Sequence, residues 1–185
     1  GITLRDQKIL GDPEIALLVG GSDGRPVRHL GILGFSREYL AQQSVVTTSI
    51  ENVNMSTVGV FDIDASAKTE IEPLIESSTS SGLLDVYQFQ YLSDPESLQK
   101  GFSSTGESFV VGARISGPAT SSFSGPLDTE QDYIPESANI QVVLVADTDI
   151  LADRLWVQVQ TFFGQKIASA FADKCSLITN QAKNL

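Results

Sequence analysis

Two short segments of the chain carry residues whose types and spacing could support chemistry. The first, Gly20-Gly21-Ser22-Asp23-Gly24, follows an apolar run and fits the Gly-x-Ser-x-Gly pattern of a hydrolase nucleophile. A nucleophilic Ser22 needs a helix directly after it, which Arg25-Pro26 disfavours, and a histidine base late in the chain, whereas His29 lies seven positions away. We therefore interpret the segment as a glycine-rich hairpin turn, and a serine hydrolase using Ser22 is the third alternative for function.

The second segment is acidic and begins where an apolar run ends. Residues 142–146 predict a buried strand, and Asp147-Thr148-Asp149 follows it directly. Ligands bind beyond the carboxyl ends of strands in open α/β sheets, and a carboxylate at a helix start is favoured by the helix dipole. Thr148 or Asp149 could equally be a structural N-cap. The candidate ligand- or partner-binding residues are Asp147, Asp149, Asp153, Arg154, Ser116 and Gly117.

Metal, thiol and nucleotide chemistry are not expected of this chain. A hard cation needs six or more oxygen ligands, and the acidic segment has no glycine-centred calcium loop. Cys175 is the single cysteine, which excludes an internal disulfide, and no histidine follows it to act as the base of an amidotransferase. The sequence contains neither a Walker A motif nor Gly-x-Gly-x-x-Gly. We expect no enzyme activity and no cofactor.

Composition restricts the class of protein and its partners. The 185 residues fit a single domain, residues 1–185, with 41% hydrophobic and 19% charged residues. A net charge of −11 argues against nucleic acid and against docking on anionic lipid. No apolar run approaches 18 residues, so we expect that the chain itself crosses no membrane. The chain begins without a recognisable start and is expected to be part of a longer protein.

The hydrophobic pattern predicts an α/β domain with layers of strands and covering helices. Pro73 places one strand at a sheet edge, and the continuous apolar runs 109–115 and 140–146 suit central strands covered on both faces. Residues 116–138 predict a long functional or mobile loop. Strands are predicted over residues 15–19, 30–35, 58–61, 70–75, 83–91, 109–115 and 140–146. Helices are predicted over residues 94–100, with Asp94 as the N-cap, and over 149–163 and 176–184.

Residues 142–156 resemble the auxiliary-component family of ABC-type transport systems involved in gliding motility. In that family a strand ending in Ala-Asp-Thr-Asp leads into Leu-Ala-Asp-Arg-Phe/Leu-Trp-Val-Gln, and this chain matches from Ala146 to Gln158. Phe162-Phe163-Gly164 and Phe171-Ala172-Asp173 follow in the same order, and Lys174-Cys175 replaces an Asn-Gly pair. Upstream segments resemble the family at Leu10–Pro13, Pro26–His29, Asn52–Met55, Pro73–Ser78 and Arg114–Gly117.

The resemblance implies a fold, a location and partners. The fold would be similar to class I glutamine-amidotransferase-like (flavodoxin-like) domains, a three-layer α/β sheet with covering helices that can include antiparallel edge strands. The domain would be the later part of an extracytoplasmic region at the periplasmic face of the inner membrane, anchored by transmembrane helices outside this chain. Its partners would be the membrane and ATPase subunits of an ABC transporter.

The function implied is a non-catalytic binding or scaffold domain that contacts transporter subunits, a sugar or peptide ligand, or other envelope proteins. The alternative is a stand-alone carbohydrate- or small-ligand-binding domain, with its site near Asp147, Asp149 and residues 117–123. Fold alone does not confer activity, so an amidotransferase-like fold would be present here without its chemistry.

Overall fold

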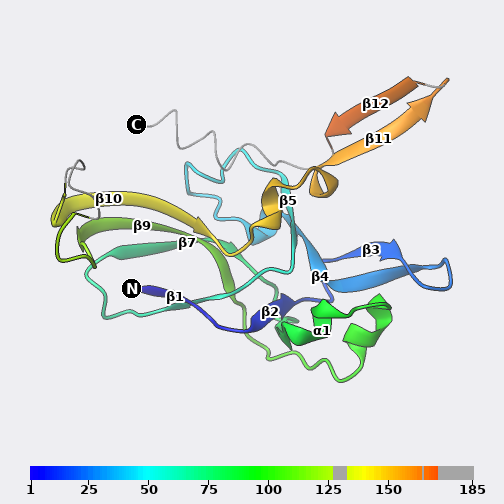
Figure 1. Cartoon of the computed structure of the whole chain (residues 1–185), viewed down its shortest axis with the longest axis horizontal. Helices are drawn as coiled ribbons and strands as arrows, with labels where there is room; N and C mark the ends of the chain where they lie inside the picture. The colour runs from blue at the N-terminus through cyan, green and yellow to red at the C-terminus, as the bar shows by residue number, and fades with distance from the viewer. Residues whose placement is uncertain (127–132, 164, 171–185) are drawn as a thin grey trace.

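Antiparallel β-strands joined by turns and short helices make up this protein (Figure 1). The computed structural model describes residues 1–126, 133–163 and 165–170. The strands are β1 (Ile2–Leu4), β2 (Lys8–Gly11), β3 (Ala16–Gly20), β4 (Pro26–Ser36), β5 (Asn52–Ser56), β6 (Phe61–Ile63), β7 (Glu70–Glu76), β8 (Gly82–Asp85), β9 (Val110–Thr120), β10 (Glu136–Val145), β11 (Val157–Phe162) and β12 (Gln165–Ala170). The helical elements are α1 (Tyr87–Gln90) and the 3₁₀ turns η1 (Arg37–Tyr39), η2 (Pro95–Gln99), η3 (Asp149–Leu151) and η4 (Asp153–Leu155).

The strands form one larger sheet and three smaller ones. In the five-stranded sheet the order is β1-β6-β9-β10, with β7 also paired to β9. Strands β3-β4-β5 form a second sheet, and β2-β8 and β11-β12 form two-stranded pairs. Among the described strands every pairing is antiparallel.

The prediction of a three-layer α/β, flavodoxin-like fold is therefore wrong. A parallel sheet needs crossover connections of a dozen or more residues, usually helical, and such connections bury both faces of the sheet. The α-helix of the described chain has four residues, and no described strand has a parallel neighbour. The strands predicted over residues 30–35, 109–115 and 140–146 correspond to β4, β9 and β10, whereas the strand predicted over 58–61 is wrong because β6 begins at Phe61. An apolar run does not reveal the direction of its neighbours.

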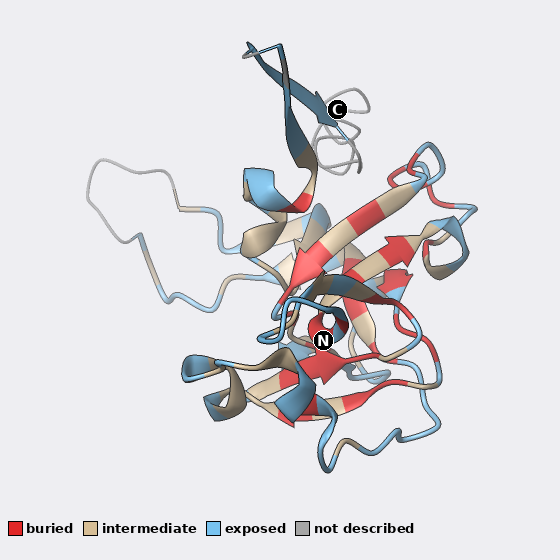
Figure 2. Cartoon of the chain, turned by 90° about the vertical axis from the view of Figure 1, so that its right-hand side faces the viewer, coloured by how far each residue is buried: buried red, intermediate tan, exposed pale blue. Residues whose placement is uncertain are grey.

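The main hydrophobic core lies where the β3-β4-β5 sheet and the five-stranded sheet meet, and buried positions concentrate on these strands in Figure 2. Along β4 the buried residues alternate with less buried ones towards its end, as expected for a strand with one face on a core. The fully buried members include Leu10, Leu33, Phe35, Val53, Met55, Leu74, Ile75 and Val111. A smaller cluster under α1 and η2 consists of Ala16, Leu30, Leu84 and Leu98.

Strand β9 is the centre of the larger sheet, which confirms the prediction for residues 109–115. It pairs with β10 along one edge and with β7 along the other. Pro73 lies in β7 beside a register shift, and β7 pairs with β9 among the named strands, so the edge position predicted from the missing N–H is confirmed. The same prediction of a central strand is wrong for β10, whose ladder partner in the described chain is β9 alone and whose Val142 is exposed.

Several helix and strand predictions differ from the structure. Residues 83–91 form β8 followed by α1, because the Gln88 side chain accepts the Asp85 N–H at 2.9 Å and starts a helical turn. Residues 94–100 form η2, with Asp94 accepting the Glu96 N–H as the predicted N-cap. The predicted helix 149–163 is replaced by η3, η4 and β11, and the predicted helix 176–184 lies outside the described residues. No helix among the described residues is long and apolar enough to cross a membrane.

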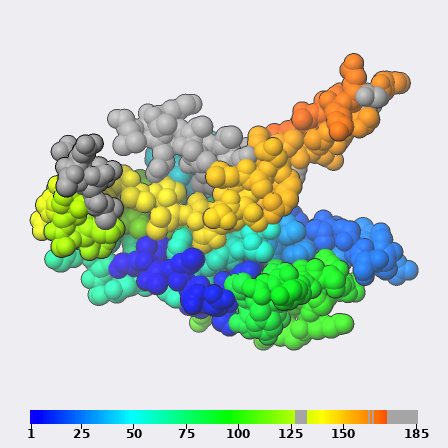
Figure 3. All heavy atoms as spheres, viewed as in Figure 1, coloured from blue at the N-terminus to red at the C-terminus, as the bar shows by residue number. Residues whose placement is uncertain are grey.

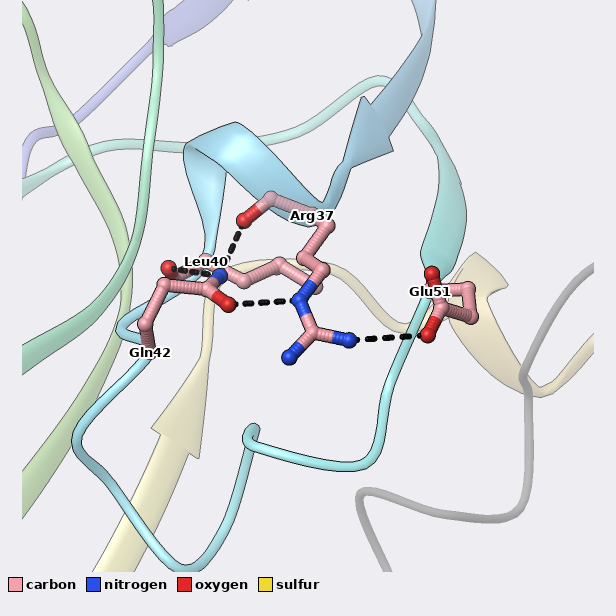
Figure 4. A network of polar contacts seen from close by, with 4 residues as sticks. All are labelled: Arg37, Leu40, Gln42 and Glu51. Atoms are coloured by element: carbon pink, nitrogen blue, oxygen red, sulfur yellow. Dashed lines mark hydrogen bonds and ion pairs between the residues drawn. The ribbon is translucent and has the colours of Figure 1, made fainter.

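The loop between β4 and β5 is held by the side chain of Arg37 (Figure 4). Its guanidinium donates to the Gln42 side chain at 2.7 Å and to the Glu51 carboxylate at 2.9 Å. The Gln42 amide in turn donates to the carbonyl oxygens of Arg37 and Leu40. This exposed network fixes the loop, but such surface contacts each contribute little to stability.

A buried carboxylate joins the start of β3 to the loop after β7. Asp12 is fully buried and accepts hydrogen bonds from the Ser78 N–H at 2.9 Å and the Ser78 hydroxyl at 2.8 Å. It also accepts the Glu14 N–H at 3.0 Å. These donors compensate for the loss of water around the carboxylate, since a buried charge is tolerated where its hydrogen bonds are made.

Replacing Asp12 with alanine is expected to lower the free energy of unfolding by about 2–4 kcal/mol, because the buried donors of Ser78 and the partly buried N–H of Glu14 lose their acceptor. Asp64 is the matched control: it accepts bonds from Ser66 in a similar local turn but is exposed. Urea unfolding followed by circular dichroism measures both variants. Equal effects of Asp12→Ala and Asp64→Ala would contradict a structural role for the buried carboxylate.

Candidate functional site

The carboxylate of Asp147 accepts two backbone hydrogen bonds at the position where the chain leaves β10. Its Oδ2 accepts the Ser56 N–H at 2.9 Å, and its Oδ1 accepts the Asp149 N–H at 2.6 Å. One residue earlier, the Ala146 carbonyl accepts the Gly59 N–H at 2.8 Å. We call Asp147, Ser56 and Asp149 the Asp147 corner. It connects β5 to the turn η3 and thereby positions everything that follows β10.

Two further contacts fix the segment after the corner. The Asn54 side chain in β5 donates to the Leu155 carbonyl at 2.8 Å, and the Leu155 side chain is buried. The Arg154 guanidinium donates to the Asp149 carboxylate at 2.8 Å. Both partners of that ion pair are substantially exposed, so it contributes at most about 1 kcal/mol. Contacts to β5 therefore hold η3 and η4 in place.

Burial raises the pKa of the Asp147 carboxyl, because the charged form loses water. The hydrogen bonds from the Ser56 and Asp149 backbones oppose this shift, and the neighbouring charge of Asp149 adds to it. The carboxylate is thus half-buried, engaged by backbone donors and less acidic than a solvated aspartate. It can accept a further hydrogen bond, but both of its oxygens already bind backbone N–H groups, as expected for a structural residue.

A cleft of about 620 Å³ opens beside the Asp147 corner, between the N-terminal segment and the end of β10. These two segments, blue and yellow, both appear on the face shown in Figure 3. Apolar lining comes from Leu4, Ile9, Phe61, Val86, Leu144, Val145 and Ala146, and polar lining from Arg5, Asp6, Gln7, Lys8, Thr57, Asp147 and Thr148. A largely apolar lining with a few convergent polar groups is the usual character of a ligand or peptide site.

The two cations that line the cleft are already paired. Arg5 donates from Nε to Asp62 at 3.0 Å and lies over the Phe109 ring, 5.7 Å from its centroid. This pairing raises the pKa of the Arg5 guanidinium and lowers that of the Asp62 carboxyl. Lys8 forms an ion pair with Asp85. The cleft therefore offers an apolar surface and one half-buried carboxylate, rather than a free positive charge.

Two strained residues line this cleft. Gln7 has φ 54° and Thr57 has φ 55°, both in the left-handed region that non-glycine residues seldom adopt. Hydrogen bonds hold these conformations: the Thr57 N–H donates to the Gly31 carbonyl at 2.7 Å, and the Val86 N–H donates to the Gln7 carbonyl at 3.2 Å. Such residues persist where the surrounding structure enforces them, and they concentrate at binding sites. Nothing in the sequence pattern identified them.

The structure divides the predicted site residues into two groups. Asp147, Asp149 and Arg154 are joined by direct contacts, and Asp153 lies next to them in η4. Ser116 and Gly117 lie in β9, where Gly117 has φ 101° and its N–H donates to the Asn139 side chain. Ser116 is paired with Gln141, six residues before Asp147 along β10. Residues 117–123 are therefore separated from the Asp147 corner by the length of a strand, and the structure does not bring these two parts of the predicted site together.

The capping predictions at this corner also need correction. The N-cap position of η3 is Thr148, but its side chain makes no capping hydrogen bond. Asp147 accepts the Asp149 N–H in its place, one residue earlier than predicted. The described residues contain no group of three or more His, Cys, Asp or Glu that could hold a metal ion.

The Ser22 segment is the tip of the β3-β4 hairpin, which confirms its interpretation as a turn. The Gly21 N–H donates to the Arg25 carbonyl at 2.7 Å, and Ser22 is exposed. His29 lies along β4, paired with Leu17, and its Nδ1 accepts the Gly31 N–H at 3.2 Å. Burial lowers the pKa of His29. Cys175 lies outside the described residues.

A second hollow of about 420 Å³, not predicted from the sequence, lies near the buried Asp12. Its centre is Glu14, which accepts hydrogen bonds from the Tyr39 hydroxyl at 3.1 Å and the Ser80 hydroxyl at 2.9 Å. The Ser80 and Tyr39 bonds lower the pKa of Glu14, and burial with the Glu14 contact raises that of Tyr39 to about 12. The lining is Glu14, Glu38, Tyr39, Leu40, Ala41, Glu76, Ser77, Ser78, Thr79 and Ser108.

A family model described as an ABC-type uncharacterized transport system matches residues 1–181. No curated protein and no solved structure matches the chain significantly.

Replacing Asp147 with alanine is expected to lower the free energy of unfolding by about 1–3 kcal/mol at neutral pH, because the Ser56 and Asp149 N–H groups lose their acceptor. The raised pKa means that the folded state takes up the Asp147 proton more readily than the unfolded state. The stabilising contribution of Asp147 should therefore be smallest at neutral pH. It should grow as the pH falls through the raised pKa towards the ordinary carboxyl value.

Urea unfolding of the wild type and Asp147→Ala at several pH values measures this dependence. Asp64 is the control, because its pKa is shifted in the opposite direction: hydrogen bonds from Ser66 and the N-terminal charge lower it. The contribution of Asp64 should diminish as the pH falls. A parallel response of Asp147→Ala and Asp64→Ala would refute the burial of the Asp147 carboxylate.

Proposed function

The chain belongs to the family of ABC-type transport-system components whose model matches residues 1–181, and from this membership we propose that it is a non-catalytic binding domain. It contacts other subunits of the transport system and contributes a docking surface rather than a reaction. Nucleotide turnover belongs to the ATPase subunit, and translocation to the membrane subunit. The domain acts on the extracytoplasmic side, anchored by helices outside this chain, in a system of the gliding-motility type.

The observation that carries this proposal is the cleft beside the Asp147 corner. Its apolar surface, formed by residues such as Leu4, Phe61 and Leu144, suits an apolar partner segment. The half-buried Asp147 carboxylate and the Thr148 hydroxyl at its end can accept hydrogen bonds from the backbone or side chains of that segment. The strain retained at Gln7 and Thr57 supports a pre-formed surface.

A second candidate function rests on the size of the same cleft. About 620 Å³ lies within the range of small-ligand pockets, so the domain could bind a small molecule by itself. The same apolar lining favours a ligand with a substantial apolar part over a bare sugar. Residues 117–123 are not part of this site.

The position of Asp147 supports a role without catalysis. Its two oxygens accept hydrogen bonds from the backbone N–H groups of Ser56 and Asp149, so its role is mainly structural. Ser22 occupies a hairpin tip, and His29 is engaged by Gly31 within β4. A Ser22→Ala variant should therefore retain every property of the wild type, including any trace of esterase activity. An esterase activity that disappears in Ser22→Ala would overturn the proposal.

Replacing Leu4 with arginine is expected to weaken association with the transporter subunits at least several-fold, because it puts an unpaired charge on the apolar cleft surface. The measurement is co-purification of the membrane and ATPase subunits with the full-length protein carrying the variant. Leu18→Arg is the matched control: Leu18 is 64% exposed and Leu4 54%, both lie in strands, and Leu18 is not part of the cleft.

Thermal-shift measurements separate the two candidate functions. A ligand present at 100 times its Kd should stabilise the domain by about 2.7 kcal/mol, an effect that Leu4→Arg removes. Stabilisation by an amphipathic small molecule, with subunit association equal in Leu4→Arg and Leu18→Arg, would favour the stand-alone ligand-binding domain. Loss of association in Leu4→Arg alone supports the docking surface.

A further inference from the structure

Strands β11 and β12 form a hairpin arm that extends away from the rest of the molecule (Figure 1; Figure 3, orange). The six pairs from Val157↔Ala170 to Phe162↔Gln165 follow one register without a bulge. Every residue of β12 is exposed, and the arm joins the body through η4. An isolated two-stranded hairpin is at best marginally stable in water, so an arm of this kind gains from an environment that covers it.

The arm differs from the body in charge. Residues 157–170 contain one charged side chain, Lys166, and no acidic residue, in a chain whose net charge is −11. Exposed edge strands of soluble proteins are usually protected by charges, proline or bulges. In β11 and β12 the only charge that could protect the edges from pairing with another chain is Lys166.

Exposed apolar side chains lie at the tip of the arm and, further along it, on both of its faces. Phe163, at the turn, is 100% exposed and has φ 47°. Val159 and Ile167 are both more than half exposed. Val159 is paired with Ala168, and Ile167 with Gln160, and because adjacent pairs of the ladder point to opposite faces, these two apolar side chains lie on opposite sides. A partner that packs on one face would cover only one of them.

We propose that the tip of this arm enters the interface of a lipid bilayer, with Phe163 as the leading side chain. The interface of a bilayer admits polar as well as apolar side chains, so it can surround Phe163 and contact both faces of the arm behind it, whereas a one-sided protein groove contacts one face. Lys166 can keep its ammonium at the level of the phosphate headgroups while its methylene stem lies along apolar surface. The inference rests on the proposed function, because it needs a domain that is held beside a membrane.

The arm is long enough for its tip to touch a membrane while the acidic body stays away from the headgroups. A strand of six residues is about 20 Å long, whereas the Debye length at physiological salt is about 8 Å. Most of the repulsion between the body and an anionic headgroup layer is therefore screened when the tip touches the membrane. A neutral phosphatidylcholine surface should accept the tip at least as well as an anionic one.

One aromatic tip binds a bilayer weakly, so it needs tethering. Even a myristoyl chain gives only marginal, reversible membrane binding. A domain already anchored to the membrane presents its tip at a high effective concentration, which makes a weak contact persistent. The arm would then set the orientation of the domain above the bilayer rather than recruit it.

Tryptophan fluorescence on tethered protein tests the proposal. The chain has one tryptophan, Trp156, so Phe163→Trp in a Trp156→Phe background provides a single reporter at the tip. The domain is attached by an N-terminal histidine tag to phosphatidylcholine vesicles that contain a nickel-chelating lipid. We expect a blue shift of the emission on tethering and a loss of intensity when the acyl chains are brominated. Tyr91→Trp in the same background is the control, because Tyr91 is 91% exposed but belongs to the body, and it should show neither change.

Further variants separate lipid from protein contacts. Lys166→Glu should reduce the blue shift on vesicles that contain phosphatidylglycerol more than on phosphatidylcholine alone. Emission of Phe163→Trp that is unaffected by tethering and by brominated lipid would overturn the proposal. A blue shift that appears without lipid and depends on protein concentration would also overturn it, because the tip would then be covered by a second copy.

Two checks keep the outcome interpretable. If Trp156→Phe fails to fold, a nitroxide on Phe163→Cys in a Cys175→Ser background reports the same depth through its accessibility to oxygen and to a water-soluble nickel complex. The vesicle contains no transporter subunit, so a negative result there leaves the association that depends on Leu4 intact. Loss of that association with normal tip insertion would instead reject the proposed docking function.

Discussion

The backbone N–H groups of Ser56 and Asp149 need an acceptor where the chain leaves β10, and the Asp147 carboxylate supplies it. This contact joins two segments that lie 91 residues apart in the sequence. One wall of the cleft, the turns η3 and η4, and the direction in which the arm departs all depend on it. A carboxylate suits the position because its two oxygens can serve two donors in different directions, whereas a hydroxyl would have to serve both with one oxygen.

Asp12 is a second carboxylate that accepts backbone hydrogen bonds, in this case between the segment before β3 and the loop after β7. It is fully buried and binds the loop after β7, whereas Asp147 stays partly accessible at the edge of a cleft. The difference in burial separates their roles. A carboxylate saturated by buried donors contributes to stability, but one that keeps an accessible side can also meet a partner. The proposed docking surface therefore lies at Asp147 and not at Asp12.

Features governed by neighbouring residues were predictable from the sequence. The hairpin turn at residues 20–24 and the Asp94 cap depend on local turn chemistry, and the central position of β9 follows from its apolar run. The helix predicted over residues 149–163 failed because spacings of four between Leu151, Leu155 and Val159 outweighed the two-residue alternation of Val157-Gln158-Val159-Gln160, which marks a strand. Pairing direction and the partners of Asp147 are long-range properties, and no local pattern encodes them. The α/β fold was carried over from a resemblance, and the antiparallel ladders contradict it.

The distribution of charge is consistent with the proposed position of this domain beside a membrane. A strongly acidic surface favours solubility and repels anionic headgroups, so such a body is kept away from the bilayer unless something else makes the contact. Placing that contact on an arm almost free of charge separates the two demands, since the ladder of β11 and β12 supplies reach without adding acidic groups. The arm joins the body at η4, and Asn54 binds the Leu155 carbonyl within η4, so the arm and the Asp147 corner are attached to the same strand, β5. In the proposed arrangement, the contact of the arm with the membrane would set the direction in which the cleft faces its partner.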